Sequence, residues 1–273
     1  MSHFTVAVFT EDENQNIGEL LEPFSEHLEV ELYVSKTKDD LIQRECETMQ
    51  MAFESHYQEW QKDRTAYEAK KNPDHIKYLQ KLPDLMKRTA EEIYRDVIER
   101  YDEDEIDENG GILSTYNPKS KWDWYEIGGR WQGMLILKPG KTGQRGNPGL
   151  MTSMTENYDA AYVADLDFHA MRRKHLEEMA PYEKAMTGGF YKEEYMREKY
   201  PNEKDYVQRN SGFSTFAALT PDGTWRESGQ MGYFGMSSST PEDEREWEDN
   251  YYDRFIKPAI TNGWYITIVD CHI

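Results

Sequence analysis

Alternating apolar and polar positions predict strands at both ends of the chain. "HFTVAVFT" places Phe4, Val6 and Val8 on every second position, and "HLEVELYVS" alternates in the same way from Leu28 to Val34. Side chains two residues apart lie on one face of a strand, so this spacing predicts strands with one buried face. "GWYITIVDCHI" closes the chain as another strand.

Between these strands, the apolar positions recur at helical spacing. From Ile42 to Tyr67 they return every three or four residues, after Thr37, which is typical of a helix N-cap. Asn72-Pro73 is expected to end or kink this helix, and a second helix follows Pro83. The pattern predicts a helical hairpin over residues 38–108, inserted between strands.

The second half of the chain alternates between strand and helix signals. Residues 112–137 and "AAYVADLDF" have strand character, and Pro221-Asp222-Gly223 predicts the turn of a hairpin. Thr240 followed by Pro241 is typical of a helix start. We therefore predict an α+β fold with a mostly antiparallel sheet, built from both chain ends and the middle, as a single domain of residues 1–273.

The composition sets limits on location and partners. The chain has 273 residues and a formal net charge of −20, and no apolar run approaches the roughly 18–20 residues of a membrane span. We expect no membrane association and, because phosphates are repelled, no binding to long nucleic acids. The two cysteines, Cys46 and Cys271, lie far apart, which favours a reducing, cytosolic location.

Charge is distributed unevenly along the chain. Residues 91–108 contain ten acids against Arg95 and Arg100, and residues 241–254 contain seven acids against two arginines. One segment reverses the sign: "KSKWDWYEIGGRWQGMLILKPGKTGQRGNPG", residues 119–149, combines aromatic residues and a glycine pair with the most basic loop of the protein.

This segment is the predicted ligand site. Indole faces stack on planar groups, and a guanidinium recognises phosphate or carboxylate. The expected ligand is therefore a small, nucleotide-like anion. The residues predicted to bind it are Trp122, Trp124, Tyr125, Arg130 and Trp131, with Lys141 and Arg145 closing over it. The competing interpretation is structural, in which the three tryptophans pack in the core.

Two other functions stay open. The acidic runs predict a protein inhibitor that imitates nucleic acid and occupies the basic groove of a host enzyme. A hydrolase acting on a nucleotide-like ligand is the other alternative, and its catalytic residues are unknown, because no metal-binding or nucleophile motif is present. No metal or cofactor is predicted. Cys271 and His272 should face opposite sides of a strand, and His3 is a neighbour of the last strand if the terminal strands pair.

The block "KWDWYEIGGRW", with "HFTVAVFT" and "ITIVDCHI" at the two ends, resembles an uncharacterised family of proteins found in bacteriophages and bacterial mobile elements. The resemblance implies a host-interaction or anti-defence role, exerted in the cytosol of the host cell through a small ligand or a host protein. It implies no oligomeric state.

Overall fold

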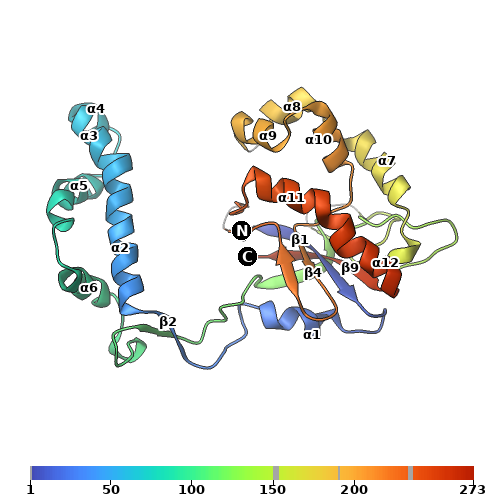
Figure 1. The fold of residues 1–273 in the computed structure, drawn as a ribbon, viewed down its shortest axis with the longest axis horizontal. Helices are drawn as coiled ribbons and strands as arrows, with labels where there is room; N and C mark the ends of the chain where they lie inside the picture. Colours follow the sequence, from blue (N-terminus) through green and yellow to red (C-terminus); the bar gives the residue numbers. More distant parts are fainter. Residues whose placement is uncertain (1, 150–153, 190, 233–235) are drawn as a thin grey trace. The chain divides into compact units, whose positions relative to one another are not determined.

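The chain forms two compact units. The computed structural model describes residues 2–149, 154–189, 191–232 and 236–273. One unit combines the segment up to Leu28 with Asn117–Ile273, and Glu29–Tyr116 form the other. Figure 1 shows the helices and strands of both units.

The larger unit is built on a mixed sheet of seven described strands. Their order is β5-β4-β9-β1-β7-β8, and β6 pairs with β9 on the edge that β4 also uses. The β1–β7 and β4–β5 pairs are parallel and the others antiparallel, which confirms the predicted α+β fold with a mostly antiparallel sheet. The strands are β1 His3–Thr10, β4 Trp124–Gly129, β5 Asn147–Pro148, β6 Ala160–Tyr162, β7 Ala217–Leu219, β8 Trp225–Glu227 and β9 Tyr265–His272.

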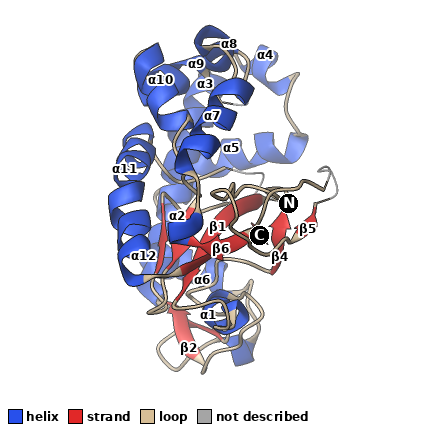
Figure 2. Ribbon diagram, turned by 90° about the vertical axis from the view of Figure 1, so that its right-hand side faces the viewer, coloured by secondary structure: helices blue, strands red, loops and turns tan. Residues whose placement is uncertain are grey.

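The two terminal strands lie at the centre of this sheet. β1 and β9 are antiparallel over their whole lengths, from His3 opposite His272 to Thr10 opposite Tyr265. Beyond the strands, the N–H of Ser2 donates to the carbonyl of Ile273, and the N–H of Ile273 donates to the carbonyl of Ser2, both at 3.1 Å. Figure 2 shows the two chain ends side by side, at the same end of these strands.

Helices cover both faces of the sheet. On one face, α11 (Pro241–Tyr251) and α12 (Lys257–Asn262) pack Trp247 and Tyr251 against Phe9 and Ile266. On the other face, α1 (Ile17–Leu21) contributes to a second core with β1 and β9. Figure 1 shows the two helix layers on opposite sides of the strands. Alternate side chains of β1 therefore pack into two different cores, one on each face of the sheet.

Four further helices lie on the α11 side, namely α7 Phe168–Glu178, α8 Tyr182–Thr187, α9 Glu193–Lys199 and α10 Glu203–Asn210. A small core of Met186, Tyr200 and Tyr206 holds α8, α9 and α10 together. Breaks at Pro181 and Pro201 keep these helices short, because proline cannot continue a helix hydrogen-bond ladder.

The other unit has its own core and its own small sheet, which lies outside the predicted insertion of 38–108. Leu79 and Leu82 are fully buried within it. The strand predicted from Leu28 begins only at Tyr33, because its partner β3 has three residues. The elements are β2 Tyr33–Lys36, α2 Lys38–Ala52, α3 Gln58–Lys62, α4 Arg64–Glu68, α5 Pro73–Leu85, α6 Ala90–Ile98 and β3 Ile112–Ser114.

The helical part of this unit contains more helices than the two of the predicted hairpin. Asp63 leaves the helical conformation and caps the next helix by accepting a hydrogen bond from the N–H of Ala66. Pro83, expected to precede the second helix, lies inside α5, and Thr89 starts α6 with a capping box. Local caps thus divide one periodic stretch into several helices. In the described part of the chain, no helix is both long and apolar enough to cross a bilayer.

Candidate functional site

Polar side chains gather on one face of the sheet where β1 begins and β9 ends. This is the face that α11 and α12 cover further along the strands, since His3 and Thr5 precede Ala7 and Phe9 at spacings of two. Cross-strand partners share a face, so the register defines two rows. The first row is Trp124–His272–His3 and the second is Glu126–Asp270–Thr5.

His3 is held by a buried carboxylate. Its Nδ1 lies 2.8 Å from Oδ1 of Asp270, whose side chain is 2% exposed. The other oxygen of Asp270 accepts a hydrogen bond from the backbone N–H of Arg130 at 2.9 Å. Gly129 makes this approach possible, because its φ is +55° and a Cβ there would overlap the Asp270 side chain. The glycine pair at the end of β4 therefore positions the carboxylate.

His272 forms a second pair of the same kind. Its Nδ1 lies 2.6 Å from Oδ1 of Asp123, which directly precedes β4. The indole of Trp124 stacks on the imidazole with ring centroids 5.2 Å apart and an interplanar angle of 16°. The His3 ring meets the His272 ring edge-on at 5.0 Å. Two carboxylate-bound imidazoles therefore lie side by side.

The hydrogen bonds define which nitrogen of each ring is available for chemistry. An ionised carboxylate only accepts hydrogen bonds, so Nδ1 is the donor in both His3 and His272. The Nε2 atoms have no hydrogen-bond partner among the described residues, and that of His272 is buried. A buried polar atom without a partner costs about 1–3 kcal/mol, which is typical of a functional position.

Two of the predicted ligand residues lie on the opposite face of the sheet. Trp122 is 9% exposed, and its Nε1–H donates to the carbonyl of Leu21 at 3.1 Å. Its ring meets Tyr125 edge-on at 5.1 Å, and burial raises the pKa of that phenol. The alternation of a regular strand would place Trp122 and Trp124 on one face. The strand β4 begins only at Trp124, directly after Asp123, whose N–H donates to the carbonyl of His272. Because Trp122 lies before the strand, the alternation of side chains does not extend to it.

Arg130 and Trp131 remain near the histidine pair in sequence but differ in environment. The side chain of Arg130 is exposed and forms no ion pair with any residue in the described ranges. Trp131 is partly buried against the core beneath α11. Among the aromatic residues predicted to bind the ligand, Trp124 is the large exposed side chain at this site, with 43% of its surface accessible.

The basic loop does not close over Trp124. Lys141 forms an ion pair with Asp165 at 2.9 Å and lines a cavity together with Tyr265. Tyr265 and His272 are at opposite ends of β9, about 23 Å apart at 3.3 Å per residue. Arg145 donates to the carbonyl of Glu156 and lies over the ring of Tyr158. The seven predicted residues therefore do not line one pocket.

The site is also less basic than expected. Asp123, Glu126 and Asp270 contribute three carboxylates against the one guanidinium of Arg130. With neutral imidazoles, the local charge is negative, so an anionic ligand needs a protonated imidazole beside Arg130. Imidazoles oriented by carboxylates are a common arrangement for acid–base chemistry.

The sequence contained a signal for this site. The prediction that Cys271 and His272 face opposite sides is confirmed: Cys271 lies in the core on the α1 side, where burial raises the pKa of its thiol. The conditional neighbour of the last strand, His3, does pair with His272. The two carboxylate partners were not predicted, because Asp123 and Asp270 lie far from His3 in sequence.

The described residues contain no group of three or more His, Cys, Asp or Glu side chains arranged to hold a metal ion. Comparison of the chain with protein-family models, with curated proteins and with solved structures gives no match. The resemblance to a bacteriophage family therefore stays a prediction.

Proposed function

We propose that the larger unit hydrolyses a phosphate ester of a small, nucleotide-like ligand, with His3 and His272 as general base and general acid. The observation that supports this proposal is the pair of neighbouring imidazoles, each with Nδ1 on a different carboxylate. Ester hydrolysis needs one group to take a proton from water and another to give a proton to the leaving oxygen.

We assign the two roles from the exposure of the two rings. His3 is the more exposed ring, so its Nε2 removes a proton from water as the new oxygen–phosphorus bond forms. His272, as imidazolium, donates the Nε2 proton to the leaving oxygen as the old phosphorus–oxygen bond breaks. Asp270 and Asp123 fix the tautomers and stabilise the protonated rings, as carboxylates do in other acid–base sites. Such catalysis contributes about 10²–10⁴ in rate.

Trp124 and Arg130 supply recognition in this proposal. An exposed indole stacks on a planar group of the ligand with about 1–3 kcal/mol, and the free guanidinium pairs with the phosphate. Because Trp124 covers His272 and Nε2 of that ring is buried, the indole must turn before the acid reaches a leaving group. Ligand binding and the opening of the site are therefore one event.

Hydrolysis of bis(p-nitrophenyl) phosphate and of cyclic nucleoside phosphates tests the proposal. We expect a bell-shaped pH profile and a loss of at least about a hundredfold in kcat for His3→Gln and for His272→Gln. His169→Gln is the matched control, because His169 is exposed and lies outside the site. Absence of hydrolysis, or equal rates in the wild type and His3→Gln, would contradict the proposal. Nucleotide binding without turnover would favour ligand capture instead.

The acidic-mimic function is a second candidate, and its two acidic runs, residues 91–108 and 241–254, lie in different units. Asp102, Glu103, Asp104 and Glu105 are exposed around a short 3-10 turn, so their charges are presented to solvent. Neutralising Asp102–Glu108 should abolish binding to a basic host protein, and about 0.5 M salt should do the same, because exposed charges are screened. Binding that is indifferent to both changes would argue against it.

A further inference from the structure

A cavity lies on the α11 side of the sheet. It has a volume of about 250 Å³ and lies between α9, α11 and the segment that leads into β7. Ligand pockets of about 300–1,000 Å³ hold drug-sized molecules, so this one has room for a single ring system. Its wall consists of Tyr191, Lys199, Ser214, Thr215, Phe216, Ser228, Glu244, Trp247 and Glu248.

The sheet register places this cavity next to His3. The N–H of Phe216 donates to Oγ1 of Thr5 at 3.2 Å, and Thr5 shares a face with His3 two residues away, about 7 Å along the strand. Because β1 and β7 are parallel, with Val6 opposite Ala217, the segment before β7 runs back towards His3. Segment 214–216 thus connects the cavity wall to the row of histidines.

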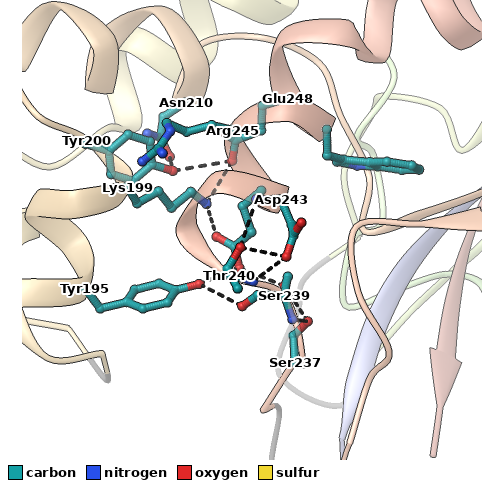
Figure 3. Close-up of polar contacts among 12 residues, drawn as sticks. Tyr195, Lys199, Tyr200, Asn210, Ser237, Ser239, Thr240, Asp243, Arg245 and Glu248 are labelled. Atoms are coloured by element: carbon teal, nitrogen blue, oxygen red, sulfur yellow. Dashed lines mark hydrogen bonds and ion pairs between the residues drawn. The ribbon is translucent and has the colours of Figure 1, made fainter.

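The polar side of the cavity is a buried ion cluster, shown in Figure 3. Lys199 reaches from α9 to Glu244 at 2.5 Å and to Glu248 at 2.9 Å, both on α11. Burial opposes its charge, but Tyr200, Glu248 and Glu244 together hold the pKa of Lys199 above its ordinary value. The lysine is therefore a charged partner of the two glutamates rather than a nucleophile.

The carboxylates of Glu244 and Glu248 differ in how many hydrogen bonds they accept. Glu244 accepts from Lys199, from the Tyr195 hydroxyl at 3.0 Å and from Ser239 at 3.2 Å. Glu248 shares one oxygen with Lys199 and Tyr200, but its Oε2 is buried without a partner in the described part of the chain. One lysine against two glutamates leaves a net negative charge. The Oε2 atom of Glu248 therefore lacks a hydrogen-bond donor among the described residues.

We infer that this cavity receives the amino-bearing nucleobase of the ligand, with Glu248 accepting a hydrogen bond from the exocyclic amine. The inference deepens the proposed function, because it places the phosphate at His3, the base under α11 and a second planar group of the ester on Trp124. The negative wall excludes a second phosphate, and Trp247 supplies aromatic surface for a planar ring. The predicted substrate class is a phosphate diester in which one of the two esterified groups is an amino-substituted nucleoside.

Adenosine and inosine form the matched pair of probes, since an amino group in one replaces an oxo group in the other. Calorimetry with the unmodified protein should show adenosine binding at least about tenfold more tightly, because inosine leaves the carboxylate unpaired. Glu248→Gln should bring the ratio of the two affinities close to one. Glu246→Gln is the control on the same helix: Glu246 is exposed and pairs with Arg254, so the ratio should persist.

A second variant protects the test against loss of folding. If Glu248→Gln is unfolded by thermal melting, Ser228→Leu fills the cavity instead and should weaken adenosine binding about tenfold or more. An unchanged affinity ratio in folded Glu248→Gln, or unchanged adenosine binding in Ser228→Leu, would overturn the inference. Adenosine preference without any hydrolysis would overturn the proposed reaction and keep the cavity assignment. Hydrolysis that requires His3 but shows no base preference would overturn the cavity assignment alone.

Discussion

His3 and His272 come from opposite ends of the chain, yet their rings lie edge to face with centroids 5.0 Å apart. Each ring has a different carboxylate on Nδ1: Asp270 for His3 and Asp123 for His272. The pairing of β1 with β9 produces this relationship, and Asp123 reaches it because β4 lies along the other edge of β9. The site therefore exists only after the long-range strand pairs have formed.

The first prediction concerns the carboxylate that fixes His3. Asp270→Asn should lower kcat on bis(p-nitrophenyl) phosphate by about a hundredfold or more, because an amide stabilises neither the imidazolium nor a single tautomer. Glu126→Gln is the matched control, since Glu126 lies opposite Asp270 on β4.

A far smaller loss in Glu126→Gln would assign the effect to the His3–Asp270 contact. Equal losses in the two variants would show instead that the negative charge of this row matters and that the contact does not.

The second prediction concerns the backbone turn that supports Asp270. Gly129→Ala should destabilise the protein by about 2–5 kcal/mol, the sum of a left-handed conformation and an overlap with Asp270. Gly140→Ala provides the control, because Gly140 also has a positive φ of +79° but has no atom within 4 Å of the added Cβ. It should cost about 1–2 kcal/mol. Urea unfolding measures both values, and equal costs would refute the role of the overlap.

The third prediction separates two tryptophans of one motif. Trp122→Ala should destabilise the larger unit by about 3–5 kcal/mol, because it removes a buried ring and the hydrogen bond to Leu21. Trp124→Ala should cost about 1 kcal/mol or less, since the ring is 43% exposed, but should weaken nucleotide binding about 5- to 150-fold. Thermal melting and calorimetry distinguish the two effects. The reverse pattern would place the ligand on the α1 side of the sheet.

Local sequence patterns predicted much of the fold but little of the site. The alternation of "HFTVAVFT" and "GWYITIVDCHI" predicts β1 and β9, since period two is a property of each strand alone. Which strands pair depends on contacts between residues more than two hundred positions apart, and no local pattern encodes that choice. The contact between His3 and Asp270 follows from the pairing of β1 with β9. The sequence could therefore predict that His3 neighbours the last strand only on the condition that the terminal strands pair.

The aromatic block shows the opposite limit. Its composition suggested one hollow, but Trp122 and Trp124 lie on different faces because the chain enters the sheet between them. The helical unit shows a similar limit, since Asp63 acts as a cap inside an otherwise periodic stretch. A cap of this kind is a single side-chain hydrogen bond, and it overrides the helical pattern of its neighbours.

The last prediction uses a buried carboxylate beneath the basic loop. Asp159 is fully buried and accepts hydrogen bonds from the N–H groups of Gly133 at 2.6 Å and Gly146 at 2.8 Å. Burial raises its pKa above the ordinary 3.8, although these donors act in the other direction. The folded protein therefore binds this proton more tightly than the unfolded chain. Its contribution to stability is fully present below pH 3.8 and is lost as the pH rises through the folded pKa.

Urea unfolding across this pH range should show the sign. The amide of Asp159→Asn can satisfy only one of the two glycine N–H groups, which costs about 1–3 kcal/mol at every pH. The titration of Asp159 adds to this cost at low pH, so the stability difference between the wild type and the variant should fall as the pH rises. Asp222→Asn provides a control of opposite sign. The hydrogen bond from Thr220 lowers the pKa of Asp222, so its contribution is present above pH 3.8 and is lost as the pH falls. Parallel pH dependence in the two variants would contradict the assignment of Asp159 as a carboxylate destabilised by burial.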